Sequence, residues 1–208
     1  MGLSDVNIML ENGNLGRGAT TTDGVAGLIL TGKAVPDKTV LNKVYQLSST
    51  RDLVTRGITE ENNPLVYKDI TAFYSKAGDG AELYLLIVAE ATTLTQVCSS
   101  EADSPLRKLI DHAKGRIRLV GINKSPPAEY VSDTETTGID KDVVTAAAAV
   151  QELAESYTKQ VNPFRVLLPA LAWTGSTENL FKPREGSYNR VAFVMAADTV
   201  ESGAIGQV

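Results

Sequence analysis

Short runs of apolar residues recur along the chain, and most of them are bounded by glycine, proline or clusters of polar residues. A continuous apolar run of about five residues is typical of a strand that is covered on both faces of a sheet. Residues 83–88, with the sequence Leu-Tyr-Leu-Leu-Ile-Val, are the clearest example. On this basis we expect strands at residues 25–30, 43–47, 83–88, 117–122, 164–168 and 190–195.

Between these runs, apolar residues recur at intervals of three and four positions, which is the period of an amphipathic helix. Pro64 after Asn63 is a helix start signal, because proline suits the first helical position and forces the preceding residue into an extended conformation. The clearest helical pattern follows Asp140 and continues to Val161. We expect helices at residues 50–57, 64–77, 104–113 and 141–161. The alternation predicts an α/β fold with a mixed, partly parallel sheet flanked by helices.

The first residues follow a different pattern from the rest of the chain. Val6, Ile8 and Leu10 alternate with mostly polar residues, which predicts a half-buried strand, and three glycines follow before residue 19. We therefore interpret residues 1–22 as an extended, strand-forming arm with a glycine-rich hinge. An ordinary edge strand of the core explains the alternation equally well.

The remaining residues, 23–208, are expected to form one α/β core domain. Two long polar stretches, residues 123–139 and 174–189, interrupt the alternation of strands and helices. Their composition favours exposed loops on the surface of that domain.

Composition and charge exclude several classes of function. The net charge is −5, and neither half of the chain is basic, which argues against a nucleic-acid partner. Cys98 and His112 are the only residues of their types, so neither an internal disulfide nor a structural zinc site is expected. The longest apolar run, residues 83–89, is far shorter than the roughly 20 residues that span a membrane. We expect a soluble protein with no membrane partner.

One motif resembles a phosphate-binding loop, because Gly27 and Gly32-Lys33 have its glycine and lysine spacing. Ala34 stands where a hydroxyl would hold Mg²⁺, and Pro36 is incompatible with a long helix starting at Lys33. We therefore expect no nucleotide site here.

The other candidates for chemistry also have ordinary explanations. His112 has no nucleophile in a suitable motif, and Cys98 has no adjacent cation to activate it. Acidic residues between 133 and 142 could bind a divalent cation, but their loop setting favours a solvated face. We expect no catalytic residue, no cofactor and no metal ion.

A basic cluster is the most notable charge feature of the sequence. It consists of Arg107, Lys108, Lys114, Arg116 and Arg118, with Asp111 as the acidic residue among them. A solvated surface with local ion pairs is the simpler interpretation. The alternative is a docking surface for an acidic protein, for which Arg107, Lys108, Arg116 and Arg118 are the candidate contact residues.

An ordered series of segments resembles contractile tail sheath proteins of phages and prophages. The N-terminal half of those proteins has an apolar strand, a strand that runs into a Ser-x-x-Asp helix, a helix with paired aromatic residues, and another apolar strand. The corresponding segments here are residues 24–32, 44–57, 70–74 and 80–88, and residues 162–170 and 189–198 resemble a sheath-like branch of the family.

The resemblance implies a non-enzymatic structural subunit. Sheath subunits form stacked rings around an inner tube, so the implied partners are other copies of this chain and an inner tail tube protein. The implied location is a virion tail or an assembled injection apparatus, after synthesis in the bacterial cytoplasm. Sheath subunits also exchange terminal strands, which suits Val6, Ile8 and Leu10. Because family members have a C-terminal tube-facing region, the resemblance implies a shortened sheath protein that lacks it.

The alternative is a small soluble α/β enzyme or ligand-binding domain. Open α/β sheets bind ligands where their strands end. For this chain such a site is expected near Asn123 or Ala172.

Overall fold

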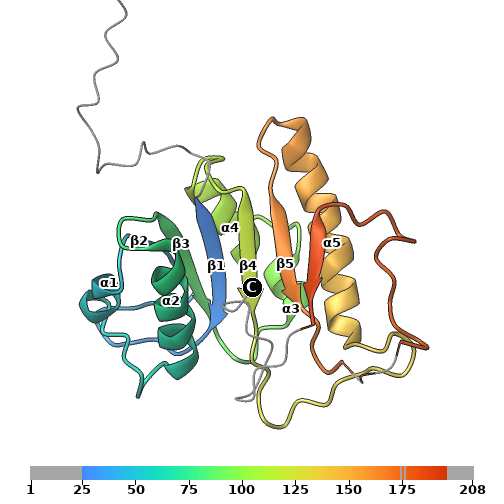
Figure 1. The fold of residues 1–208 in the computed structure, drawn as a ribbon, viewed down its shortest axis with the longest axis horizontal. Coiled ribbons are helices and arrows are strands. Elements are labelled where there is room, and N and C mark those ends of the chain that lie inside the picture. Colours follow the sequence, from blue (N-terminus) through green and yellow to red (C-terminus); the bar gives the residue numbers. More distant parts are fainter. Residues whose placement is uncertain (1–24, 174, 176, 196–208) are drawn as a thin grey trace, which may run out of the picture.

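The computed structural model describes residues 25–173, 175 and 177–195, which form a six-stranded sheet with helices on both faces (Figure 1). The strands are β1 (Ala26–Thr31), β2 (Val44–Leu47), β3 (Leu83–Val88), β4 (Leu119–Asn123), β5 (Arg165–Pro169) and β6 (Val191–Val194). The helices are α1 (Arg51–Thr55), α2 (Pro64–Ala77), α3 (Leu94–Cys98), α4 (Pro105–His112) and α5 (Lys141–Lys159). The predicted α/β class is confirmed. The predicted arm, residues 1–22, lies outside the described residues.

The strands follow the order β2-β3-β1-β4-β5-β6 across the sheet. All neighbouring strands are parallel except β2, which runs antiparallel to β3. The chain passes from β1 to β3 on one side and then crosses to β4 on the other side of β1. This reversal places a topological switch point between β1 and β4, where open sheets commonly have their functional sites.

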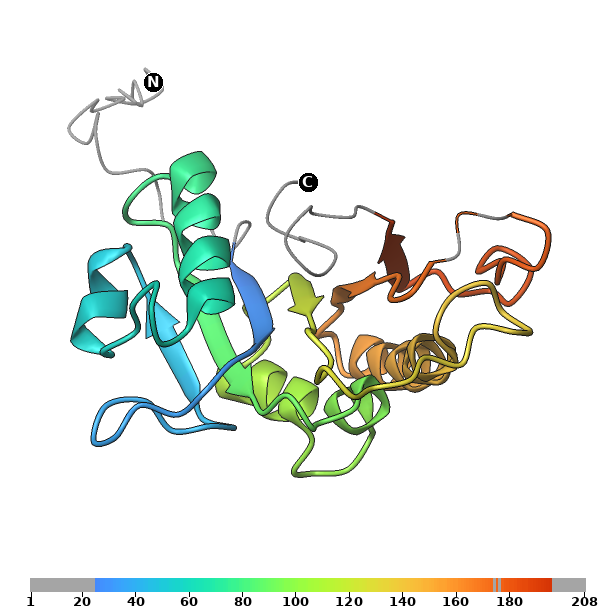
Figure 2. The same cartoon turned by 90° about the horizontal axis from the view of Figure 1, so that it is seen from below.

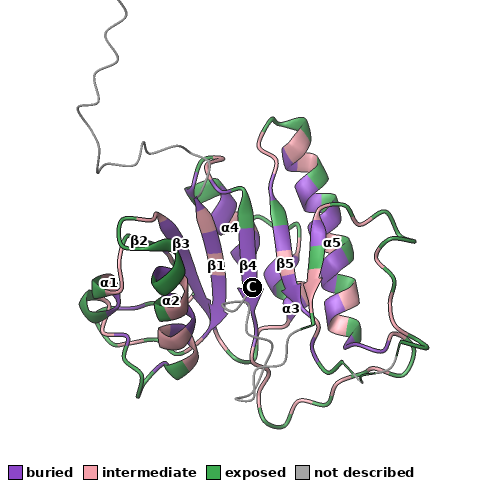
Figure 3. Cartoon of the chain, in the orientation of Figure 1, coloured by how far each residue is buried: buried purple, intermediate pink, exposed green. Residues whose placement is uncertain are grey.

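Helices cover the two faces of the sheet unequally. Helices α1 and α2 lie over β2, β3 and β1, whereas α3, α4 and α5 lie on the opposite face (Figure 2). In β1, Leu30 packs into the α1–α2 cluster and Ile29 into the α3–α5 cluster. Every residue of β3 is buried, which explains why its sequence is a continuous apolar run (Figure 3).

Helix α3 was absent from the sequence prediction. It contains only five residues, too few to show a helical period. Its start is a capping box, in which Thr93 accepts a hydrogen bond from the Gln96 amide and Gln96 accepts one from the Thr93 amide. The Thr-x-x-Gln spacing was the available signal for this helix.

The end of the long helix was also predicted incorrectly. Helix α5 ends at Lys159, and Val161, which was expected on its buried face, is 81% exposed. Val161 has a φ of 64°, in the left-handed region, and Asn162 is followed by Pro163. Because proline disfavours a helical conformation in the residue before it, the chain leaves the helix before reaching this pair.

Apart from Asn123, which is the last residue of β4, the two predicted loops contain no helix or strand within their described residues. The first is exposed or half-buried between residues 125 and 137, but both of its ends are buried. Lys124 is 4% exposed and Ile139 is 1% exposed, although the sequence predicted an exposed loop over residues 123–139. Both ends pack at the carboxyl edge of the sheet. Among the described residues, no helix is sufficiently long and apolar to span a bilayer.

Candidate functional site

The first end of the loop at residues 123–139 belongs to a polar cluster at the switch point of the sheet. Asn123 is the last residue of β4, beside the end of β1, where the ligand-binding alternative placed a site. The Ser125 amide donates a 3.1 Å hydrogen bond to Oγ1 of Thr31, the last residue of β1. This hydrogen bond holds the start of the loop against the neighbouring strand.

Asn123 also connects the sheet to helix α2. Its Nδ2 atom donates a 2.7 Å hydrogen bond to Oδ2 of Asp69, and both residues are more than 90% buried. Burial raises the pKa of Asp69, and the hydrogen bond from Asn123 partly opposes that shift. Asn123 Oδ1 is buried and has no hydrogen-bond partner.

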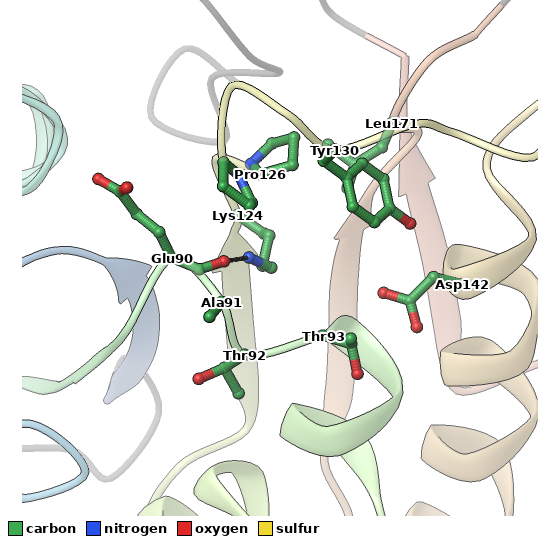
Figure 4. A pocket seen from close by; sticks show the side chains of 10 residues that line it. Glu90, Ala91, Thr92, Thr93, Lys124, Pro126, Tyr130, Asp142 and Leu171 are labelled. Atoms are coloured by element: carbon green, nitrogen blue, oxygen red, sulfur yellow. Dashed lines mark hydrogen bonds between the residues drawn. The ribbon is translucent and has the colours of Figure 1, made fainter.

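Lys124, the residue after Asn123, is also buried. Its Nζ donates hydrogen bonds to the main-chain carbonyls of Glu90 and Ser125 (Figure 4). Burial lowers the pKa of Lys124, whereas the negative charges of Asp142 and Glu90 partly oppose that shift. Because Glu90 follows β3, Lys124 links the segments that leave β3 and β4.

A small pocket lies beside Lys124. Its lining includes Thr92 and Thr93 after β3, Tyr130 of the first loop, and Asp142 at the start of α5 (Figure 4). The pocket volume is about 40 Å³. Sites for small molecules usually have roughly 300–1,000 Å³. In this conformation the pocket can hold water but not a nucleotide or another cofactor of that size.

The carboxylate of Asp142 has a structural role at this pocket. It accepts hydrogen bonds from the amides of Leu94 and Thr95, at 2.7 and 3.0 Å, and from the Thr95 hydroxyl at 2.6 Å. These hydrogen bonds join the start of α5 to the first turn of α3. Asp140 is buried and caps α5, and Asp133 lies 3.8 Å from Lys141. Within the described residues, no group of three acidic, histidine or cysteine side chains could hold a metal ion.

The segment that resembles a phosphate-binding loop is packed against α2. The Lys33 amide donates a 2.6 Å hydrogen bond to Oδ1 of Asn63, whose Nδ2 donates back to the Lys33 carbonyl at 3.2 Å. A Cβ on Gly32 would lie 2.6 Å from Asn63 Oδ1 and 2.9 Å from Cγ2 atoms of Val66 and Ile87. Close packing against the start of α2 therefore explains this glycine.

The single cysteine and histidine occupy ordinary structural positions. Cys98 is fully buried at the end of α3, and burial raises the pKa of its thiol. His112 is exposed at the end of α4, with its ring centroid 6.0 Å from that of Tyr84.

The predicted basic cluster forms contacts within the described fold. Arg107 Nη1 donates a 2.8 Å hydrogen bond to the Ser100 carbonyl, and Lys108 Nζ lies 3.2 Å from Oδ1 of Asp103. Arg118 Nη1 donates to the Pro163 carbonyl at 3.2 Å. Such exposed contacts are weak, so these side chains could contact a partner protein instead. The predicted docking role of Arg107, Lys108 and Arg118 stays a prediction.

Arg116 is held more firmly than the other basic residues. Its guanidinium contacts both carboxylate oxygens of Glu82, at 2.7 and 2.9 Å. It also donates a hydrogen bond to the Tyr84 hydroxyl and lies 5.4 Å from the centre of the Tyr84 ring. This arrangement fixes the loop before β4 against β3, and a role of Arg116 in binding a partner also stays a prediction.

Strand pairing defines a sheet face that lies opposite α5. Leu119 pairs with Arg165, Gly121 with Leu167, and Leu167 with Ala192, so these residues share one face. No residue of β4, β5 or β6 belongs to the buried cluster under α1 and α2, and no described helix lies over this part of the sheet (Figure 2). Leu119 is 43% exposed, Leu167 is half-buried and Ala192 is exposed.

This open face ends at the outer edge of β6, which pairs with no other described strand and is called the free edge of β6 below. The Arg190 and Val194 carbonyls accept hydrogen bonds from the Val166 and Ala170 amides, both at the β5 side. Because alternate residues of a strand face opposite neighbours, the main-chain groups of Phe193 face away from β5. Such an edge can accept another strand. Sequence reasoning identified β6 but not its edge position. The predicted arm residues Val6, Ile8 and Leu10 lie outside the described part of the chain.

The fold is a mixed α/β sheet, and comparison with known proteins identifies the family. The chain belongs to the family described as DUF2586, N-terminal domain, whose model matches residues 3–206. No curated protein matches the chain. A solved structure that matches is the cryo-EM structure of the anti-feeding prophage helical sheath in the contracted state, with 15% identity and a TM-score of 0.48. The match covers 98% of this chain and 50% of that chain.

Proposed function

We propose that this protein is a structural subunit of a contractile tail sheath in a phage tail or a related injection apparatus. Copies of the chain would assemble through subunit contacts around an inner tube protein, without catalysing a reaction. The observation that carries the proposal is the open, partly apolar sheet face that ends at the free edge of β6. The sequence resemblance supports it, since its segments contain five strands of the sheet, β1, β2, β3, β5 and β6, together with helix α1.

The occupant of the edge is residues 3–11 of a second copy. Val6, Ile8 and Leu10 would place three apolar side chains on one face of an added strand, and Asp5 and Asn7 would face the other way. Main-chain hydrogen bonds to β6 would supply affinity, and the apolar side chains would extend the face of Leu119, Leu167 and Ala192. An exchange of this kind links each subunit to the next and produces an open assembly when it does not close into a ring.

The assembly test uses charge at the edge of the sheet. Ala192→Lys changes an exposed side chain on the open face, and a lysine at an edge strand opposes strand addition. Thr71→Lys adds the same charge at an exposed position of α2 and serves as the matched control. A third variant replaces Val6, Ile8 and Leu10 with serine.

We expect rings, tubes or large oligomers of the unmodified protein and of Thr71→Lys in negative-stain microscopy and light scattering. Ala192→Lys and the serine variant should be monomers with an unchanged melting temperature. Failure of the unmodified protein to associate at any concentration up to its solubility limit would refute the proposal. Assembly of all the variants would refute the role of β6.

The buried ammonium of Lys124 favours a second candidate, a ligand-binding domain with a site at the carboxyl ends of the strands. This candidate requires the 40 Å³ pocket beside Lys124 to open. A thermal-shift panel of nucleotides and carboxylate metabolites tests it. A stabilising compound whose effect disappears in Lys124→Met would favour this function, whereas no shift with any compound favours the structural subunit.

A further inference from the structure

Asp69 and Asn123 form a buried pair that joins two layers of the fold. Asp69 lies on the buried side of α2, and Asn123 ends β4 on the other side of the switch point. They are 6% and 7% exposed, and a 2.7 Å hydrogen bond from Asn123 Nδ2 to Asp69 Oδ2 connects them. The pair is the direct polar link from α2 to β4.

The surroundings of Asp69 provide little compensation for a negative charge. Strands β1, β3 and β4 contain no charged residue. Lys124, next to Asn123, directs its ammonium to the carbonyls of Glu90 and Ser125. On α2 the basic residues are Lys76, which is exposed, and Lys68, which is the cation that favours the charged form of Asp69. A buried carboxylate is costly unless it is paired with a charge and fully hydrogen-bonded.

The unpartnered atom of Asn123 indicates which protonation state suits this site. Asn123 Oδ1 is buried and lacks a donor, whereas a buried acceptor normally has one. A protonated carboxyl has one O–H donor and one acceptor oxygen, which match the amide oxygen and the amide N–H of asparagine. A carboxylate has only acceptors and leaves the amide oxygen unpaired.

We propose that Asp69, when protonated, forms a closed acid–amide pair with Asn123 in the folded protein. In this pair, Asn123 Nδ2 donates to one carboxyl oxygen, and the other carboxyl oxygen donates its proton to Asn123 Oδ1. The pair holds α2 against the carboxyl end of β4. When the proton leaves, the amide oxygen loses its donor and a charge remains in the core, so contact between the two layers weakens as the pH rises.

The direction of the pH dependence follows from linkage. The pKa of Asp69 is raised from 3.8 in the folded protein, so the folded state binds the proton more tightly than the unfolded state. The resulting stabilisation is fully present below pH 3.8 and is lost as the pH rises through the pKa of the folded state. Asp69 therefore opposes the ordinary loss of stability in acid.

A carbon-13 NMR titration of the Asp69 carboxyl in the unmodified protein tests the protonation state directly. We expect a titration midpoint above 3.8, and a change in the chemical shifts of the Asn123 side-chain amide protons with the same midpoint. A midpoint at or below 3.8 would overturn the proposal. This measurement does not depend on any variant folding correctly.

Asp69→Asn provides the second test, because its amide can donate to Asn123 Oδ1 and accept from Nδ2 at every pH. We expect its melting temperature at pH 8 to equal or exceed that of the unmodified protein. The variant should also lack the decrease in stability with rising pH that the unmodified protein shows through Asp69. Asp79→Asn makes the same charge change at an exposed position and should retain that dependence. A lower melting temperature of Asp69→Asn at pH 8, or an unchanged pH dependence, would contradict the acid–amide pair.

Discussion

Replacing Gly32 with alanine tests the packing at the end of β1. The added Cβ would lie 2.6 Å from Asn63 Oδ1 and 2.9 Å from Cγ2 of both Val66 and Ile87. Val66 and Ile87 are fully buried and β-branched, so their methyl groups have no free rotamer to adopt. Asn63 is held by hydrogen bonds of 2.6 and 3.2 Å to the Lys33 main chain.

The expected change in the free energy of unfolding of Gly32→Ala follows from two opposing effects. Forcing an extra carbon into a packed site costs about 1–3 kcal/mol, and three contacts below 3.0 Å place Gly32→Ala near the upper end. Replacing glycine with alanine restricts the unfolded chain, which offsets about 0.4–1 kcal/mol. We expect a net loss of about 2 kcal/mol in the free energy of unfolding.

Equilibrium urea denaturation measures this loss, and Gly27→Ala is the matched control on the same strand. A Cβ on Gly27 meets Leu109 Cδ2 at 2.8 Å, the end of a flexible side chain that can shift. The control should therefore lose less than about 1 kcal/mol. If Gly32→Ala is as stable as Gly27→Ala, close packing against α2 is not the reason for the glycine at position 32.

Two further predictions concern helices α3 and α5, on the face of the sheet opposite α2. Asp142→Ala removes a charged group that accepts three hydrogen bonds from α3. We expect the free energy of unfolding, measured by urea denaturation, to fall by about 2 kcal/mol. A fall of less than about 0.5 kcal/mol would contradict this role of Asp142. The Cys98 thiol, which is fully buried with a raised pKa, should react with a thiol reagent only as fast as the protein opens, and rapid labelling of the native protein would show that α3 is open.

The sequence was sufficient to predict the elements whose signals are long or strongly punctuated. All six strands were expected, because five of them lie in nearly continuous apolar runs, and α2 was marked by Asn63 and Pro64. The antiparallel direction of β2 was not predictable, since apolar runs contain no information about strand direction. Helix α3 was missed because five residues are shorter than the window in which a helical period can be recognised.

The candidate site was only partly accessible to sequence reasoning. The general rule for open sheets directed attention to Asn123, which ends β4 in the structure. The sequence did not indicate that Asp69, in the middle of a helix, would pair with it from 54 positions away. Lys124 was assigned to an exposed loop because the stretch that contains it is polar, and lysine is rarely buried. Its burial depends on the carbonyl of Glu90, whose position is determined only by the complete fold.

The two halves of the sheet differ in a way that relates stability to assembly. Strands β3 and β1 are covered on both faces, so this half supplies the stable core of the chain. Strands β4, β5 and β6 are covered by α5 on one face, and no described helix covers their other face. This half ends at β6, whose outer edge pairs with no described strand. A subunit that exchanges strands needs both properties: a core that folds by itself, and an edge whose completion requires another chain. Ala192→Lys tests the second property without disturbing the first, because it adds charge to the open face and leaves both buried clusters intact.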